Sequence, residues 1–209
     1  MYRTVPTIKV ITSSGTWNKP AGCKWIKVIV TGGGGGGASA YYYGSGGWGG
    51  NPGYPGGTAI KWLNVININS VTVTIGAAGI GGGNGGGSGT AGGNSSFGSY
   101  CTGNGGAGGV YSNIGGYWGN SGTGGDINLY GDGTSNQWRE PSTGNVYVAG
   151  SARGGQSYWG GNGPGVYGAK CPPAYNWGSS GGGGSYYVGN MYGGGDGVGG
   201  VCVVEEYYE

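Results

Sequence analysis

Six consecutive glycines, Gly32 to Gly37, directly follow an apolar stretch, and glycine runs recur through the rest of the chain. Glycine makes up 62 of the 209 residues, against a usual share of roughly 7%. Each glycine in the interior of an α-helix costs about 1 kcal/mol relative to alanine, so we expect essentially no α-helix. A collagen triple helix is excluded too, because the chain has no strict Gly-X-Y register and only 8 prolines.

The remaining composition argues against a disordered chain. Charged residues make up 8% of the sequence, whereas it contains 8 Trp and 18 Tyr. Disordered segments show the opposite balance, with abundant charge and few aromatic side chains. Two alternatives to a compact glycine-rich fold stay open at this point: a flexible glycine linker between aromatic segments, and silk-like stacked strands. Against the linker, many exposed aromatics on a flexible chain would promote aggregation.

Conventional β-strand patterns lie near the two ends of the chain. Alternating or β-branched apolar residues predict strands at 7–12, 24–30, 58–63, 71–75 and 201–208. Pairing the last of these strands with the first ones is the simplest way to bury them all. The sequence therefore predicts a single all-β domain over 1–209. In it, strands from 1–75 and 200–209 form a small β-sandwich, and 76–199 form one long glycine-rich insertion.

Glycine runs have one ordered form that needs no apolar core. An extended left-handed helix of the polyproline II type has three residues per turn and no internal hydrogen bonds. Its amide and carbonyl groups must find partners in neighbouring chains, and without side chains those neighbours can approach on every side. We therefore expect the insertion to be a bundle of polyglycine II helices, held by backbone hydrogen bonds and by weak Cα–H···O contacts.

Composition excludes several classes of chemistry. The absence of histidine removes Ser-His-Asp and Cys-His catalysis and every histidine-containing zinc site. No Gly-Lys-Ser/Thr triplet of a P-loop is present, and we expect no cofactor and no metal. A formal net charge of +2 with no basic run among the aromatics predicts no nucleic-acid binding. Because no apolar run approaches 18 residues, we also expect no membrane insertion.

The cysteines and the acidic residues each allow two interpretations. The four cysteines lie far apart without a C-x-x-C pair and can form two disulfides or stay as buried free thiols, and their spacing favours the thiols. Carboxylate pairs for glycoside hydrolysis could come from Asp126, Asp132 and Asp196. Asp132 and Asp196 each precede a glycine, which is typical of a turn. We therefore expect the protein not to be an enzyme, and catalysis is the weakest of the hypotheses.

Several short motifs resemble the glycine-rich domain of bacteriophage tail fibres. They span nearly the whole chain, at 11–17, 19–22, 25–28 with the hexaglycine, 73–79, 94–98, 125–131 and 203–207. The resemblance implies a β-sandwich that carries polyglycine helices, with display loops that face a host receptor. It implies a place on a virion tail fibre joined to the rest of the fibre, and tail-fibre proteins of this kind are often homotrimers. Similar domains on bacterial surface proteins imply the bacterial cell surface as the alternative location.

Aromatic segments between the glycine runs are the candidate binding residues. Tyr and Trp offer rigid, amphipathic contact area at low entropic cost, and they supply hot spots at interfaces. The same rings could instead shield the backbone of the bundle from water. The candidates are the aromatics clustered between glycine turns, with one neighbouring arginine: Tyr41, Tyr42, Tyr43, Trp48, Trp138, Arg139, Tyr158, Trp159, Tyr186 and Tyr187.

Two functions follow from these observations. The first is a non-enzymatic receptor-binding tip of a fibre, whose aromatic loops contact a host cell-surface glycan or an outer-membrane protein. The second is a structural capping or assembly module at a fibre end, or on a bacterial surface protein, with no ligand of its own. Binding to host cells separates the two.

Overall fold

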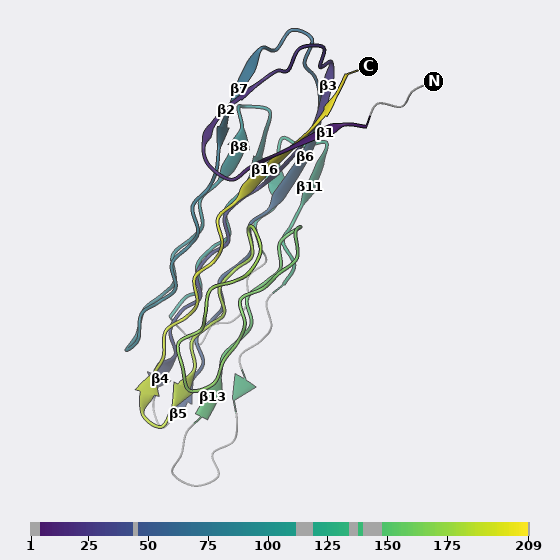
Figure 1. Cartoon of the computed structure of the whole chain (residues 1–209). Coiled ribbons are helices and arrows are strands. Elements are labelled where there is room, and N and C mark those ends of the chain that lie inside the picture. Colours follow the sequence, from purple (N-terminus) through teal and green to yellow (C-terminus); the bar gives the residue numbers. More distant parts are fainter. Residues whose placement is uncertain (1–4, 44–45, 112–118, 134–137, 140–147, 209) are drawn as a thin grey trace.

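A computed structural model describes residues 5–43, 46–111, 119–133, 138–139 and 148–208 (Figure 1). The described residues form strands and extended segments and contain no helix, which confirms the predicted all-β class. The molecule is elongated: a β-sandwich occupies one end, long extended segments run down its length, and short strands lie at the far end (Figure 1). The first and last strands both belong to the sandwich end.

Two antiparallel five-stranded sheets form the sandwich. The first has the order β1 (Thr7–Ile11), β16 (Val201–Tyr207), β3 (Trp25–Thr31), β6 (Thr58–Asn64) and β11 (Ile127–Leu129). The second has the order β10 (Gly122–Thr123), β9 (Cys101–Gly103), β8 (Ser95–Phe97), β7 (Ser70–Thr74) and β2 (Gly15–Asn18). The C-terminal strand lies between β1 and β3, so the predicted pairing of the two chain ends is confirmed.

The sandwich core is small and includes one buried charge. The indole of Trp17 packs against Phe97 with ring centroids 5.7 Å apart. Its Nε1–H donates to the fully buried carboxylate of Glu206 at 2.9 Å, and Lys9 lies 3.3 Å from the same oxygen. A buried carboxylate is tolerated only when it is paired and hydrogen-bonded, and Glu206 meets both conditions. The four cysteines are buried free thiols, as their spacing suggested.

The hexaglycine continues from β3 into an extended segment, 32–40, that occupies the centre of the long part of the molecule. Its amides donate to three different neighbours in strict rotation. Gly32 donates to the segment 51–57, the next residue to 87–93 and the third to 192–198, and the cycle repeats through residue 40. A period of three residues is that of the polyproline II helix, so this segment is a polyglycine II helix.

The carbonyl groups of this central segment are shared in the same way among three further segments. Amides from 106–109, 79–82 and 181–184 donate to carbonyls between Gly33 and Ala38. The six neighbours also bond one another in a closed ring. In order around the ring they are 50–57, 104–109, 87–93, 76–82, 192–200 and 178–185. We call these seven segments the glycine lattice. Neighbours that accept bonds from the central segment run antiparallel to it, and those that donate run parallel.

Close approach explains why the central positions are glycine. A Cβ added at any of Gly32 to Gly37 would overlap backbone atoms of a parallel neighbour, and the neighbour again changes with a period of three. Backbone contact on all sides, rather than an apolar core, holds these segments together. A flexible linker and a stack of silk-like strands are therefore both excluded for the described glycine runs.

The division of the chain between the sandwich and the glycine-rich insertion differs from the expected division in two places. Residues 32–57 lie between β3 and β6 in sequence, yet most of them belong to the glycine lattice or to the far end. Conversely, the expected insertion supplies β8 to β11 to the sandwich. These four strands are two or three residues long, too short for an alternating apolar pattern to reveal. Sandwich and lattice are thus interleaved along the sequence.

Candidate functional site

Two small sheets lie at the end of the molecule opposite the sandwich (Figure 1). One pairs β4 (Tyr41–Tyr43) with β5 (Gly46–Trp48). The other has the order β12 (Trp138–Arg139), β13 (Val148–Gly150), β14 (Tyr186–Tyr187) and β15 (Asn190–Met191). The strand β5 contacts β13 and β14, so the two sheets form one tip.

The glycine lattice determines where these strands lie. The central segment 32–40 runs directly into β4, the lattice segment 178–185 runs into β14, and β15 leads back into 192–200. Each strand therefore begins or ends at a segment whose amides are bonded to fixed neighbours. A binding surface carried by rigid elements keeps its geometry better than one carried by free loops.

Aromatic side chains pack together on this tip. Tyr41 stacks on Trp48 with centroids 6.2 Å apart and meets the edge of Tyr111 at 5.8 Å. Tyr42 packs against Tyr186 with ring centroids 5.9 Å apart. The Tyr186 ring also leaves no room for a side chain at Gly47.

A second group of contacts extends the packing. Tyr167 meets Tyr187 edge-on at 5.2 Å, and the Tyr111 hydroxyl donates to the sulfur of Met191 at 3.6 Å. We call the complete set the distal aromatic cluster: Tyr41, Tyr42, Trp48, Tyr111, Tyr167, Tyr186, Tyr187 and Met191.

The cluster combines a buried base with an exposed rim. Tyr41 and Tyr186 are each only 5% exposed, whereas Tyr42 and Tyr167 are 52% and 55% exposed. Tyr111 and Tyr187 are exposed too, at 39% and 38%. Buried rings that support exposed ones are the arrangement expected of a preformed contact surface, because the exposed rings lose little freedom on binding.

Two features that cost folding stability lie at this tip: a strained backbone and an unsatisfied buried hydroxyl. The hairpin between β14 and β15 turns at Val188, whose φ of 44° is the one positive value of a non-glycine residue in the described chain, and at Gly189. A β-branched residue is a genuine outlier there. The hydroxyl of Tyr41 is buried without a hydrogen-bond partner among the described residues, and burial raises the pKa of this tyrosine. Strain and unsatisfied polar groups concentrate at functional sites.

Most of the candidate residues predicted from sequence lie in this region. Tyr41, Tyr42, Trp48, Tyr186 and Tyr187 are members of the cluster. Three further candidates lie in the same small sheets. Tyr43 pairs with Gly46 in the first sheet, and Trp138 and Arg139 pair with Gly150 and Ala149 in the second. Tyr111 and Tyr167 were not predicted, although both also stand between glycines and share that signal with the others.

Tyr158 and Trp159 lie elsewhere. The indole Nε1–H of Trp159 donates to Thr31 Oγ1 at 2.9 Å, at the end of β3, and the residue packs against the buried sandwich cluster of Ile29, Ile60, Val201 and Val203. A tight turn from Ser157 to Gly160 directs the ring toward the sheet. These two residues therefore belong to the junction between the sandwich and the lattice, far from the tip.

The three acidic residues considered for catalysis all have local hydrogen-bond partners. Asp126 accepts from Lys61 Nζ at 2.7 Å and from the Trp62 amide at 2.9 Å, and these bonds lower its pKa. Asp132 accepts from the amide of Gly133, and Asp196 accepts from that of Gly81. Within the described ranges no three metal-ligating side chains gather into a site. The described part of the chain also has no helix of the length and apolarity that a membrane crossing requires.

Comparison with known proteins identifies a family for the chain. A search of curated proteins finds no match to the chain. A family profile described as "Glycine-rich domain" matches residues 10–207. That range begins within β1, ends at the last residue of β16 and includes the whole lattice and the tip. The chain therefore belongs to this glycine-rich domain family.

Proposed function

We propose that this protein is a non-enzymatic receptor-binding tip of a fibre, similar to those of phage tail fibres. The distal aromatic cluster is the contact surface, and a host cell-surface glycan or an outer-membrane protein is the receptor. The observation that carries this proposal is the coincidence of exposed aromatics, a strained hairpin and an unsatisfied buried hydroxyl at one end of the molecule. The strained hairpin and the unsatisfied hydroxyl cost folding stability, and a role of this end in binding would account for their presence beside exposed rings.

The opposite end suits attachment to the rest of the fibre. Apolar side chains on β1, β3 and β6 are exposed there: Ile8 at 62%, Val10 at 52%, Trp25 at 47% and Trp62 at 43%. Exposed apolar patches commonly mark interaction sites. The protein would then project from a virion tail fibre, or in the alternative from a bacterial cell surface, as a monomer or as one member of a homotrimer.

The same patch favours the second candidate function. A module that only caps or assembles a fibre needs the sandwich-end surface and has no use for the distal aromatic cluster. The two functions therefore differ in what the distal cluster contributes, and substitutions there distinguish them.

The decisive experiment measures binding of the labelled full chain to a panel of bacterial strains and their purified outer membranes. The double variant Tyr42→Ala/Tyr187→Ala removes two exposed rings and should weaken binding at least tenfold, since a single hot-spot aromatic contributes about 2 kcal/mol or more. Tyr130→Ala, which removes a 69% exposed tyrosine beside β11, is the matched control and should bind normally.

Either of two results would contradict the proposal. The first is unchanged binding by a double variant that unfolds at the same temperature as the wild type. The second is absence of binding to every strain. Both favour the structural module.

A further inference from the structure

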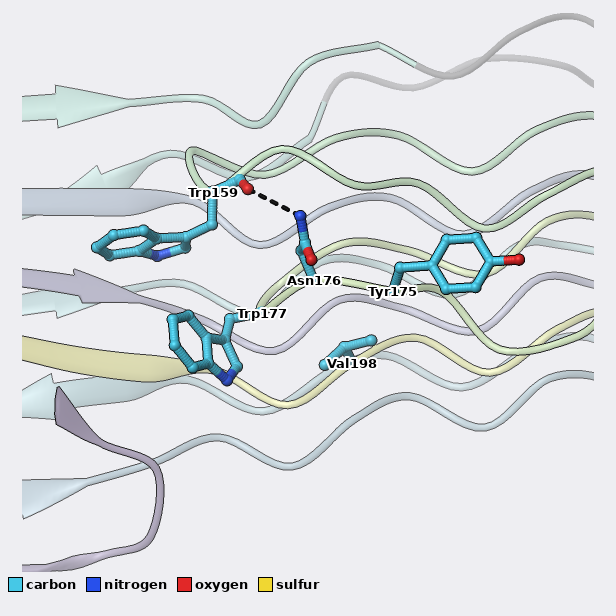
Figure 2. Close-up of a pocket in the computed structure, with 5 residues that line it drawn as sticks. All are labelled: Trp159, Tyr175, Asn176, Trp177 and Val198. Atoms are coloured by element: carbon cyan, nitrogen blue, oxygen red, sulfur yellow. Dashed lines mark hydrogen bonds between the residues drawn. The ribbon is translucent and has the colours of Figure 1, made fainter.

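An open groove lies where the strands of the sandwich give way to the glycine lattice (Figure 2). Its volume is about 380 Å³, and its lining consists of Trp159, Tyr175, Asn176, Trp177 and Val198. Sites for small ligands usually have volumes of about 300–1,000 Å³. The two indole rings meet edge to face, with their centroids 5.8 Å apart and their planes at 89° to each other.

The walls of the groove are fixed by hydrogen bonds. Asn176 Nδ2 donates to the carbonyl of Trp159 at 3.0 Å, which joins the two sides (Figure 2). The Trp159 indole is tied to Thr31, and the hydroxyl of Ser157 donates to the carbonyl of Trp177. The Trp159 indole and the backbone that carries the Trp177 ring are thereby held in place before any ligand arrives.

Three polar groups of the lining residues are left without a partner among the described residues, and one of them, the Tyr175 hydroxyl, points away from the two indoles (Figure 2). Within the part of the chain that the structure describes, the Trp177 indole N–H, the Tyr175 hydroxyl and the Asn176 Oδ1 have no hydrogen-bond partner. The side chains that carry them are exposed; Trp177 is 37% and Tyr175 is 69% exposed. No lining residue is charged.

We propose that this groove is a second binding site and that its ligand is a neutral saccharide. A pyranose ring has apolar C–H faces that pack on an indole, and hydroxyl groups around its edge that both donate and accept. The groove supplies apolar surface together with one donor, the Trp177 indole N–H, and one acceptor, Asn176 Oδ1, while the Tyr175 hydroxyl lies farther along it (Figure 2). An uncharged lining favours a neutral ligand, because an ionised one would lose hydration without gaining a partner of opposite charge.

This site is independent of the distal aromatic cluster. It lies at the opposite end of the lattice from the tip, and no residue is common to the two. On the proposed function, a ligand there would contact the projecting protein at some distance from its tip.

The test is an NMR titration of the full chain that follows the indole N–H signals. Methyl glycosides of glucose, galactose and N-acetylglucosamine are the neutral probes, and N-acetylneuraminic acid is the charged one. We expect at least one neutral probe to shift the Trp177 signal with a dissociation constant in the millimolar range, typical of a small ligand that makes few contacts. The signal of Trp62, a similarly exposed tryptophan on β6, should not move.

Variants assign the binding to the groove. Trp177→Ala should weaken binding at least tenfold, and Trp177→Phe, which keeps an aromatic face and loses the N–H, should weaken it a few-fold. Tyr175→Ala is the second variant, because this exposed ring can be removed without disturbing the lattice. Trp62→Ala and the distal pair Tyr42→Ala/Tyr187→Ala should bind the sugar normally, so failure here and failure of the tip are distinguishable.

Two results would overturn the proposal. The first is an unmoved Trp177 signal at tens of millimolar of every neutral probe. The second is a response to N-acetylneuraminic acid alone.

Discussion

Glycine in the middle of the lattice is required by the backbone of its neighbours. A Cβ at Gly35 would collide with the carbonyl of Ala107, which belongs to a parallel lattice segment and is itself hydrogen-bonded to Tyr54. Gly83, at the edge of the lattice, has no heavy atom within 4 Å of the same position. The two glycines therefore differ in the space around them, although both belong to glycine runs.

This difference predicts opposite results for the same substitution. Gly35→Ala should lower the free energy of unfolding by about 3 kcal/mol or more, because the backbone must move to relieve the overlap. Gly83→Ala should change it by no more than about 1 kcal/mol, in the stabilising direction, since alanine restricts the unfolded chain. Equilibrium unfolding in guanidinium chloride measures both. Equal effects at the two positions would contradict the lattice packing.

The unsatisfied hydroxyl of Tyr41 gives a second prediction at this scale. Tyr41→Phe removes a buried polar group that has no partner among the described residues, and should stabilise the protein by about 1 kcal/mol. The matched control is Tyr111→Phe, because the Tyr111 hydroxyl is exposed and donates to Met191; it should give no gain. A loss of stability in Tyr41→Phe would show that the hydroxyl is bonded in solution.

The four cysteine thiols give a third prediction at this scale. Burial raises the pKa of all four cysteines, and that of Cys101 to about 11. Thiolate, the reactive form, is therefore scarce near neutral pH. The native protein should resist Ellman's reagent, and the unfolded protein without reductant should titrate four thiols. If no thiol reacts after unfolding, the four cysteines instead form two disulfides.

At the scale of elements, the β14–β15 hairpin carries strain that can be measured. Val188 has a positive φ, which costs a β-branched residue about 1–2 kcal/mol. Val188→Gly should recover about 1 kcal/mol of folding stability. Val110→Gly, at an exposed valine without a positive φ, should instead reduce stability through the entropy of the unfolded chain. If both substitutions destabilise equally, the hairpin is unstrained in solution.

Elements differed in how far they could be predicted from sequence. The strands β3, β7 and β16 have enough β-branched or alternating residues to be evident, and the hexaglycine indicated a polyglycine II helix. Which segments surround that helix was beyond prediction, because glycine has no side chain to distinguish one neighbour from another. The contacts of Trp159 could not be predicted from sequence either. Its position depends on a turn and on a hydrogen bond to Thr31, 128 residues away in sequence.

At the scale of the whole molecule, the chain passes repeatedly between the sandwich and the lattice. The chain leaves β3 for the central segment, returns through 50–57 to β6, leaves β7 for 76–93 and returns to β8. It leaves β9 for 104–109 and enters β16 from 192–200. Because these lattice segments continue directly into sandwich strands, each part holds the ends of the segments that make up the other. We therefore expect the two parts to unfold together.

Amide hydrogen exchange measures this coupling directly. The amides of Gly33 to Gly37 and those of β3 should show the same opening free energy, because only global unfolding exposes either set. Val73→Ala creates a cavity in the sandwich core, where Val73 is 1% exposed, and should lower both values by about 2 kcal/mol. Suppose instead that the glycine amides exchanged faster and did not respond to Val73→Ala. The lattice would then open independently, and the tip that it carries would lack the fixed geometry on which the proposed binding surface depends.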